Sequence, residues 1–214
     1  VGDIIEKYTY NDFNQSYYIN NLIFENGVTN IESGAFNRNS QIKNIVLPKS
    51  LESIGTSAFN DCKSLQNIEM NGGTIIGQSA SSGCTELKEI ILPNCTKVIE
   101  NNAFSGCSSL KSVTLSNSVT SIGDLAFANC TSLVSITIPD SVKSINYWAF
   151  EGCTSLKSIN IPDSITDIGQ YAFGYNYDYG YKKIDNFKIY CYSGTAGEQY
   201  AKDNSLDYEL LDNH

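Results

Sequence analysis

The sequence has only one histidine, and it is the last residue, His214. A Ser-His-Asp or Cys-His catalytic site would have to use this terminal residue, where chain ends are usually poorly ordered. Metal sites built on histidine are disfavoured for the same reason, and the chain contains no Cys-x-x-Cys pair. We therefore expect no enzymatic activity, no metal site and no cofactor.

Positive charge and long apolar runs are also scarce. The chain has 14 Lys and Arg but 23 Asp and Glu, which gives a net charge of −9. Such a charge repels phosphate backbones and argues against a nucleic-acid partner. No run approaches the roughly 18 apolar residues of a membrane span, so we expect the chain not to cross a membrane. No charged-then-apolar signal peptide opens the sequence, but a mature secreted protein would lack one too.

What the sequence does contain is a repeat. Its anchors are Phe36, Phe59, Phe104, Phe127, Phe150 and Phe173. Their spacing is 23 residues except for one interval of 45, which contains a degenerate copy with Ser81 at the Phe position. Alanine precedes each anchor, an isoleucine precedes that alanine by four residues, and Leu or Ile follows the anchor by six in nearly every copy. About seven copies cover residues 28–189.

Each repeat predicts the same local structure. The segment "LVSITIP" suits a short strand that ends at proline, because proline cannot donate to a ladder. The segment "NYWAFEGC" suits a helical or 3₁₀ turn that carries Ala and Phe inward. One unit cannot bury its own apolar face, so the units must stack strand beside strand. The fold class is a repeat solenoid with a parallel β-strand ladder and short helical turns, about seven coils plus caps.

The pattern V-x-x-I-x-x-x-A-F-x-x-C-x-x-L-x-x-I-x-I-P resembles the BspA-like class of leucine-rich repeat. The stretch "SVTSIGDLAFANCTSLVSITIPDSVKSINYWAFEGCTSLKSINIPDSI" is similar to its consensus over two coils. The resemblance implies a secreted or cell-surface microbial protein that binds a protein, or a glycan, on a host or neighbouring cell. It supplies no family-wide ligand residues. A structural spacer within a larger surface protein is the alternative.

The two ends predict caps for the solenoid. Residues 1–27, rich in Tyr and Phe, predict an N-terminal cap or a partial repeat. Residues 190–214 predict a C-terminal cap, in which Thr195 and Glu198 have the spacing of a capping box and Tyr200 and Ala201 face the last coil. A final strand is expected in "SLDYELL".

Five cysteines occur at one repeat position: Cys62, Cys84, Cys107, Cys130 and Cys153. Stacked coils would place neighbouring Cα atoms about 5 Å apart, close enough for disulfides, but five parallel thiols cannot all pair. Free cysteine packs as a small hydrophobe, so buried structural thiols are the favoured interpretation. Cys95 and Cys191 lie outside this row and are expected to be the more exposed thiols.

Two regions are candidate binding surfaces. One is the outward face of the strands, where we expect contacts from Lys43, Lys88, Lys111, Thr114, Thr137, Lys157 and Asn160, with Lys188 ending the row that contains Asn160. For any single lysine, solubility is the favoured explanation, and the binding hypothesis concerns the face as a whole. The other is an insertion in the last repeat, "GYNYDYGYKK", with Tyr175, Tyr177, Tyr179 and Tyr181. We predict a recognition loop, and the alternatives are a loop folded over the cap or a crystal or oligomer contact.

Overall fold

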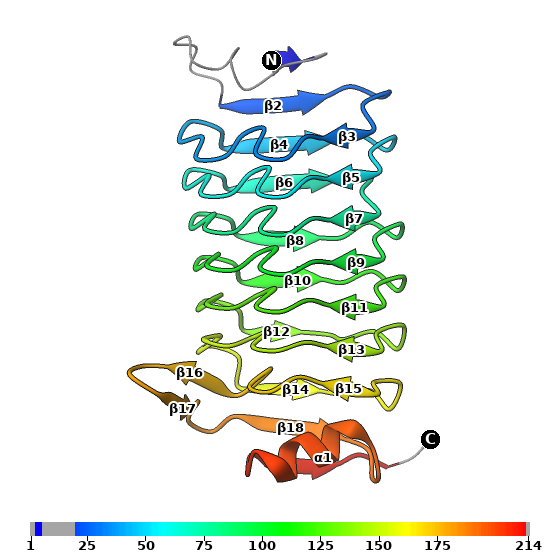
Figure 1. The fold of residues 1–214 in the computed structure, drawn as a ribbon, viewed down its shortest axis with the longest axis vertical. Helices are drawn as coiled ribbons and strands as arrows, with labels where there is room; N and C mark the ends of the chain where they lie inside the picture. Colours follow the sequence, from blue (N-terminus) through cyan, green and yellow to red (C-terminus); the bar gives the residue numbers. More distant parts are fainter. Residues whose placement is uncertain (1–2, 6–19, 213–214) are drawn as a thin grey trace.

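The computed structural model describes residues 3–5 and 20–212, and they form a solenoid of stacked coils (Figure 1). On one side of the coils, strands of successive coils lie side by side and form three parallel sheets. In order they are β1 (Asp3–Ile5), β2 (Asn21–Phe24), β4 (Asn44–Leu47) and β6 (Asn67–Met70); β8 (Glu89–Ile91), β10 (Ser112–Thr114) and β12 (Ser135–Ile136); and β14 (Ser158–Asn160), β18 (Lys188–Cys191) and β19 (Asp207–Leu210). The solenoid fold expected from the repeat is confirmed.

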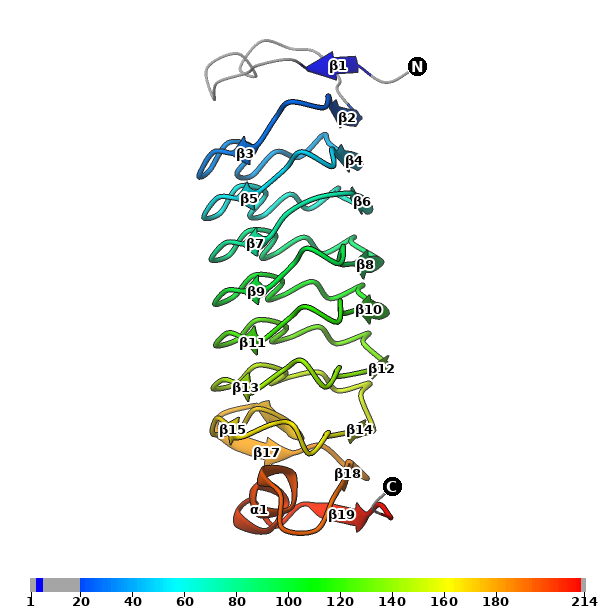
Figure 2. The same cartoon turned by 90° about the vertical axis from the view of Figure 1, so that its right-hand side faces the viewer.

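A second ladder of two-residue strands runs along the other side of the coils (Figure 2). Its seven members are β3 (Asn30–Ile31), β5 (Ser53–Ile54), β7 (Ile75–Ile76), β9 (Val98–Ile99), β11 (Ser121–Ile122), β13 (Ser144–Ile145) and β15 (Asp167–Ile168). Their register pairs each isoleucine with the isoleucine of the next coil, for example Ile122 with Ile145. The repeated isoleucine before each Ala-Phe pair therefore forms one wall of the core.

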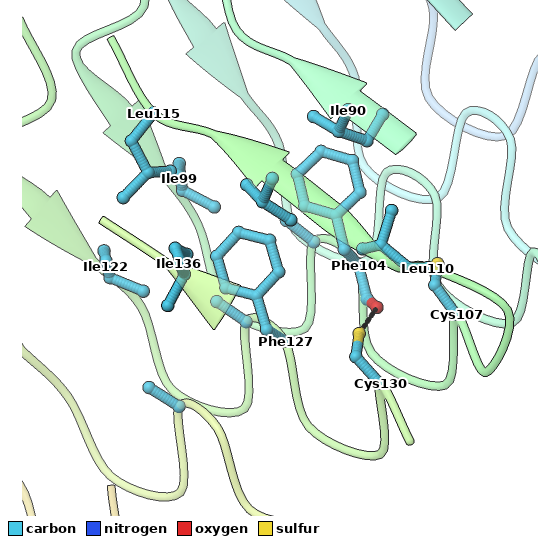
Figure 3. Close-up of a cluster of buried hydrophobic side chains, with 14 of the residues drawn as sticks. Ile90, Ile99, Phe104, Cys107, Leu110, Leu115, Ile122, Phe127, Cys130 and Ile136 are labelled. Carbon is cyan, nitrogen blue, oxygen red and sulfur yellow. Dashed lines mark hydrogen bonds between the residues drawn. The ribbon is translucent and has the colours of Figure 1, made fainter. Parts of the chain in front are cut away.

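The repeated phenylalanines stack along the solenoid axis (Figure 3). The rings of Phe104 and Phe127 lie 5.4 Å apart at an interplanar angle of 10°, and those of Phe150 and Phe173 lie 5.0 Å apart at 13°. The backbone is coupled in the same way, because the Phe104 N–H donates to the Ala126 carbonyl of the next coil at 2.8 Å. Each coil thus completes the hydrogen bonds and the core of its neighbour.

The five cysteines of the repeat are free and fully buried, as the packing interpretation predicted. Each thiol donates a hydrogen bond to a carbonyl oxygen of the preceding coil; Cys130 Sγ lies 3.3 Å from the Phe104 oxygen (Figure 3). Burial raises the pKa of both Cys107 and Cys153 to about 12. Cysteine fits this position because it is small, apolar and a weak donor facing a buried carbonyl.

Of the two thiols outside the row, Cys95 is exposed, as expected, but the prediction for Cys191 was wrong. Cys191 ends β18 and is buried, because the helix α1 (Ala196–Asp203) covers it. Gly197 of that helix lies so close that a Cβ added to it would be 2.9 Å from the Cys191 Cβ. The spacing along the chain could not show that the cap folds back over this residue.

The helix α1 closes the C-terminal end of the solenoid, with Tyr200 and Ala201 buried as predicted. The Tyr200 hydroxyl accepts the Phe173 N–H and donates to the Phe173 carbonyl, both at 2.9 Å. It therefore replaces the carbonyl that a further coil would supply. The predicted capping box is wrong in detail, because the Thr195 side chain makes no cap bond, and Glu198 instead accepts the Gly194 N–H at 2.7 Å.

At the other end, β2 occupies the strand position of a further coil. Leu22 is in register with Ile45 of β4, and the Phe24 ring meets Phe36 edge-on at 5.8 Å. The remaining aromatic residues of the predicted N-terminal cap, between residues 6 and 19, lie outside the described residues. The domain limits 1–27, 28–189 and 190–214 stay predictions.

Candidate functional site

The insertion in the last repeat is a β-hairpin rather than a loop. Strands β16 (Tyr175–Tyr177) and β17 (Tyr181–Lys183) pair antiparallel and extend from the side of the solenoid where the turns between the short and the longer strands lie (Figure 1). In the described repeats these are tight turns and not the helical or 3₁₀ turns expected. Tyr179 stands at its tip and is fully exposed, and Tyr177 and Tyr181 are 63% and 40% exposed. The hairpin interrupts an otherwise regular exterior with aromatic side chains.

Tyr175 differs from the other three tyrosines and does not belong to a recognition surface. It is only 7% exposed, and its hydroxyl donates to the Asn204 carbonyl at 3.0 Å. Its ring meets Tyr171 edge-on at 4.8 Å. The expectation that Tyr175 contacts a ligand is therefore corrected. Tyr175 lies at the base of the hairpin, where these contacts bury it and make it an anchor.

Next to the hairpin lies a row of residues in the left-handed backbone conformation. Two residues before each Phe position φ is positive, between 55° and 68°, at Gly34, Ser57, Ser79, Asn102, Leu125, Trp148 and Tyr171. The first four coils use small or polar residues, whereas the last three carry large side chains. A bulky residue in this conformation costs about 1–2 kcal/mol, and such strain tends to occur at functional sites.

Figure 1 shows the hairpin projecting beside the last coils, and the Tyr181 ring stacks on the ring of Tyr171 at 4.0 Å. The next two residues of this left-handed row, Trp148 and Leu125, line a pocket. This pocket has a volume of about 430 Å³, and its walls are Leu125, Asn129, Trp148, Glu151, Tyr177 and Tyr181.

Glu151 is the charged group in this pocket and is only 5% exposed. Its Oε1 accepts the Tyr177 N–H at 2.6 Å, and its Oε2 lies 3.4 Å from the Asn129 Nδ2. Other coils have Asn, Ser, Ala or Gly at this position. Among the described residues the ion pairs are Arg38–Asp61, Lys182–Asp178, Lys188–Glu209 and Lys202–Glu198, so none neutralises Glu151.

The strand face is a separate candidate surface. The seven residues expected there are exposed: Lys43, Lys88, Lys111, Thr114, Thr137, Lys157 and Asn160. Thr114 and Asn160 are strand residues, whereas each lysine directly precedes a strand and Thr137 directly follows β12. Exposed Ile91 and Val134 lie among them. The predicted place of Lys188 was wrong, because it is in register with Ser158, and Tyr190 stands beside Asn160. The insertion had shifted the alignment of the last repeat.

Sequence reasoning missed four of the six residues that line the pocket: Leu125, Asn129, Trp148 and Glu151. A signal was present, since a comparison of the repeats shows Leu, Trp and Tyr where Ser or Asn is usual, and Glu where small residues are usual. No group of three or more His, Cys, Asp or Glu within residues 3–5 and 20–212 is placed to hold a metal ion. No helix in this part of the chain is long and apolar enough to cross a membrane.

Comparison with known proteins agrees with the solenoid fold. The family model described as BspA type leucine rich repeat region matches residues 4–130 and 74–195, with 6 copies. Among solved structures, the leucine rich repeat protein of T. pallidum is 26% identical with a TM-score of 0.64, over 91% of this chain and 87% of that chain.

A leucine-rich repeat protein of Bacteroides ovatus is 25% identical with a TM-score of 0.56, over 91% of this chain and 67% of the other. A leucine rich cell surface protein of Faecalibacterium prausnitzii shares the fold at 24% identity and a TM-score of 0.52, over 79% and 61% of the two chains. The comparison with curated proteins gives no match.

Proposed function

The chain belongs to the BspA-type leucine-rich repeat family, and from this premise we propose that it is a non-enzymatic module that recognises another protein through its tyrosine hairpin and the adjoining pocket. Leucine-rich repeat solenoids present extended surfaces suited to protein partners. We propose a secreted or cell-surface location, in keeping with the family resemblance. We propose further that this recognition serves adhesion to a host or neighbouring cell.

One observation carries this proposal: large aromatic side chains are held exposed on a rigid frame. Tyr179 and Tyr177 project from a hairpin that Tyr175 and Glu151 attach to the solenoid. Tyrosine offers large contact area at low conformational entropy cost, and Tyr and Trp are enriched at the centres of protein interfaces. The exposed strand face, with Lys111 and Lys157 among its residues, is the second proposed contact surface.

Site-specific photocrosslinking tests the proposal. A photoreactive amino acid placed at Tyr179 should crosslink a partner from surface and matrix extracts, and the same substitution at Thr114 reports on the strand face. We expect a discrete adduct from position 179 that disappears in the Tyr177→Ser background. Adducts from position 114 alone would move the interface to the strands. Absence of a discrete adduct from both positions would favour the structural-spacer alternative.

A further inference from the structure

We propose that the pocket beside the hairpin binds the guanidinium group of an arginine side chain in a basic segment of the partner protein. This inference rests on the proposed function and specifies the chemistry of its partner. It is carried by the combination of a buried carboxylate, aromatic walls and a strained backbone row, each of which is described above.

The electrostatics of Glu151 leave a place for a cation. Glu151 is only 5% exposed, and buried charges in proteins are generally paired. Its two hydrogen bonds, from Tyr177 and Asn129, come from neutral groups. The hairpin lysines are engaged elsewhere, since Lys182 pairs with Asp178 and Lys183 donates to the Ser205 carbonyl at 2.7 Å. A cation from outside the chain would complete the site.

The aromatic walls favour a planar cation. Trp148, Tyr177 and Tyr181 line the pocket, and the last two rings meet edge-on at 5.3 Å. Aromatic faces carry negative charge density, so they attract cations, and the flat guanidinium group stacks on them while its N–H groups remain free to reach a carboxylate. These contacts suit arginine better than the strongly hydrated ammonium group of lysine.

Size and net charge agree with this ligand. A recess of about 430 Å³ can hold one long side chain, with the rest of the partner lying across the hairpin and the neighbouring turns. The net charge of −9 attracts basic segments over a longer range. Trp148 and Leu125 occupy strained positions at which the first four coils use Gly, Ser or Asn, so these large side chains are not there for the stability of the turn.

The test uses the intrinsic fluorescence of Trp148, the single tryptophan of the chain. The protein is titrated with N-acetyl-arginine amide and, separately, with N-acetyl-citrulline amide, which has nearly the same shape but no charge. We expect a saturable fluorescence change with arginine at millimolar concentration and at least tenfold weaker binding of citrulline.

Two variants make the test specific. Glu151→Gln keeps an acceptor for the Tyr177 N–H but removes the charge, and we expect it to weaken arginine binding about tenfold or more. Glu86→Gln changes the net charge equally at an exposed position remote in sequence, and should leave binding within about twofold. Equal weakening by the two variants, equal binding of citrulline, or no saturable change would overturn the proposal.

The crosslinking experiment separates this failure from failure of the proposed function. If a partner crosslinks at position 179 of the Glu151→Gln variant as strongly as in the wild type, the hairpin recognises a protein but the arginine proposal is wrong. Loss of that adduct in Glu151→Gln, with retention in Glu86→Gln, is the result we expect.

Discussion

The Tyr177 N–H donates a hydrogen bond to Glu151 Oε1 at 2.6 Å, which joins the tip-side end of strand β16 to the preceding coil. The Gly152 N–H donates to the Tyr175 carbonyl at 2.8 Å and adds a second backbone link. Glu151 thus has two roles, since it holds the hairpin and supplies the charge of the pocket. A variant that removes the acceptor should differ from one that removes only the charge.

We expect Glu151→Ala to loosen the hairpin without unfolding the solenoid. A buried hydrogen bond to a charged acceptor contributes about 1.5–3 kcal/mol, so amide exchange in residues 175–183 should quicken about tenfold or more. In Glu151→Gln the same amides should exchange nearly as slowly as in the wild type. Hydrogen exchange followed by mass spectrometry measures this, and identical exchange in all three proteins would show that Glu151 does not anchor the hairpin.

Leu125→Asn should leave the protein about as stable as the wild type, although it removes a large side chain. Leu125 has φ of 56°, and Asn102 occupies the equivalent position with φ of 59°, so relief of strain of about 1 kcal/mol offsets the lost apolar contact. Leu133→Ala, at a fully buried position, should cost about 2–5 kcal/mol. Urea unfolding compares them, and a loss of more than about 2 kcal/mol in Leu125→Asn contradicts the strain argument.

Replacement of two buried serines by alanine should change the free energy of unfolding in opposite directions. The Ser81 hydroxyl is buried with no hydrogen-bond partner among the described residues, whereas Ser116 Oγ donates to the Thr96 carbonyl at 2.9 Å. Removing an unsatisfied hydroxyl should raise the free energy of unfolding by about 1 kcal/mol, and removing a bonded one should lower it by a similar amount. Denaturant midpoints decide this, and a shift of the same sign in both variants is the contrary result.

Tyr200→Phe should destabilise the C-terminal cap. Without the hydroxyl, the buried N–H and carbonyl of Phe173 both lose their partner, at a cost of about 1–3 kcal/mol. Tyr208→Phe serves as the control, because Tyr208 is exposed and should change stability by less than about 0.5 kcal/mol. Thermal unfolding measures the difference, and equal melting temperatures for the two variants would rule out the capping role.

Alkaline conditions should destabilise the fold through the buried thiols. Burial raises the pKa of Cys107 from 9.0 to about 12, so above pH 9 the unfolded state loses this proton while the folded state keeps it. Each such thiol stabilises the folded state fully below pH 9. Its contribution to the free energy of unfolding falls as pH rises toward 12, by about 1.4 kcal/mol per pH unit. In Cys107→Ala the unfolding free energy should fall less steeply between pH 9 and 10.5, and parallel curves would contradict this.

The repeat in the sequence determined the core of this protein. Because Ile122, Phe127, Cys130 and Leu133 recur with one period, their common burial followed from the stacking of equal units. The parallel ladder followed for the same reason, since each strand can pair only with its copy in the next coil. Tyr200 and Ala201 could be assigned to the cap, because a solenoid end must be covered.

The proposed binding site could be predicted only in part, because it depends on contacts between segments that do not share the repeat. The hairpin comes from the one insertion, and only its fold shows that Tyr175 turns inward while Tyr177 reaches Glu151. Burial of Cys191 likewise depends on how α1 packs back onto β18. Periodicity determined the core by itself, whereas the placement of the insertion and the cap required the tertiary structure, since non-repeating segments find their partners only through long-range packing.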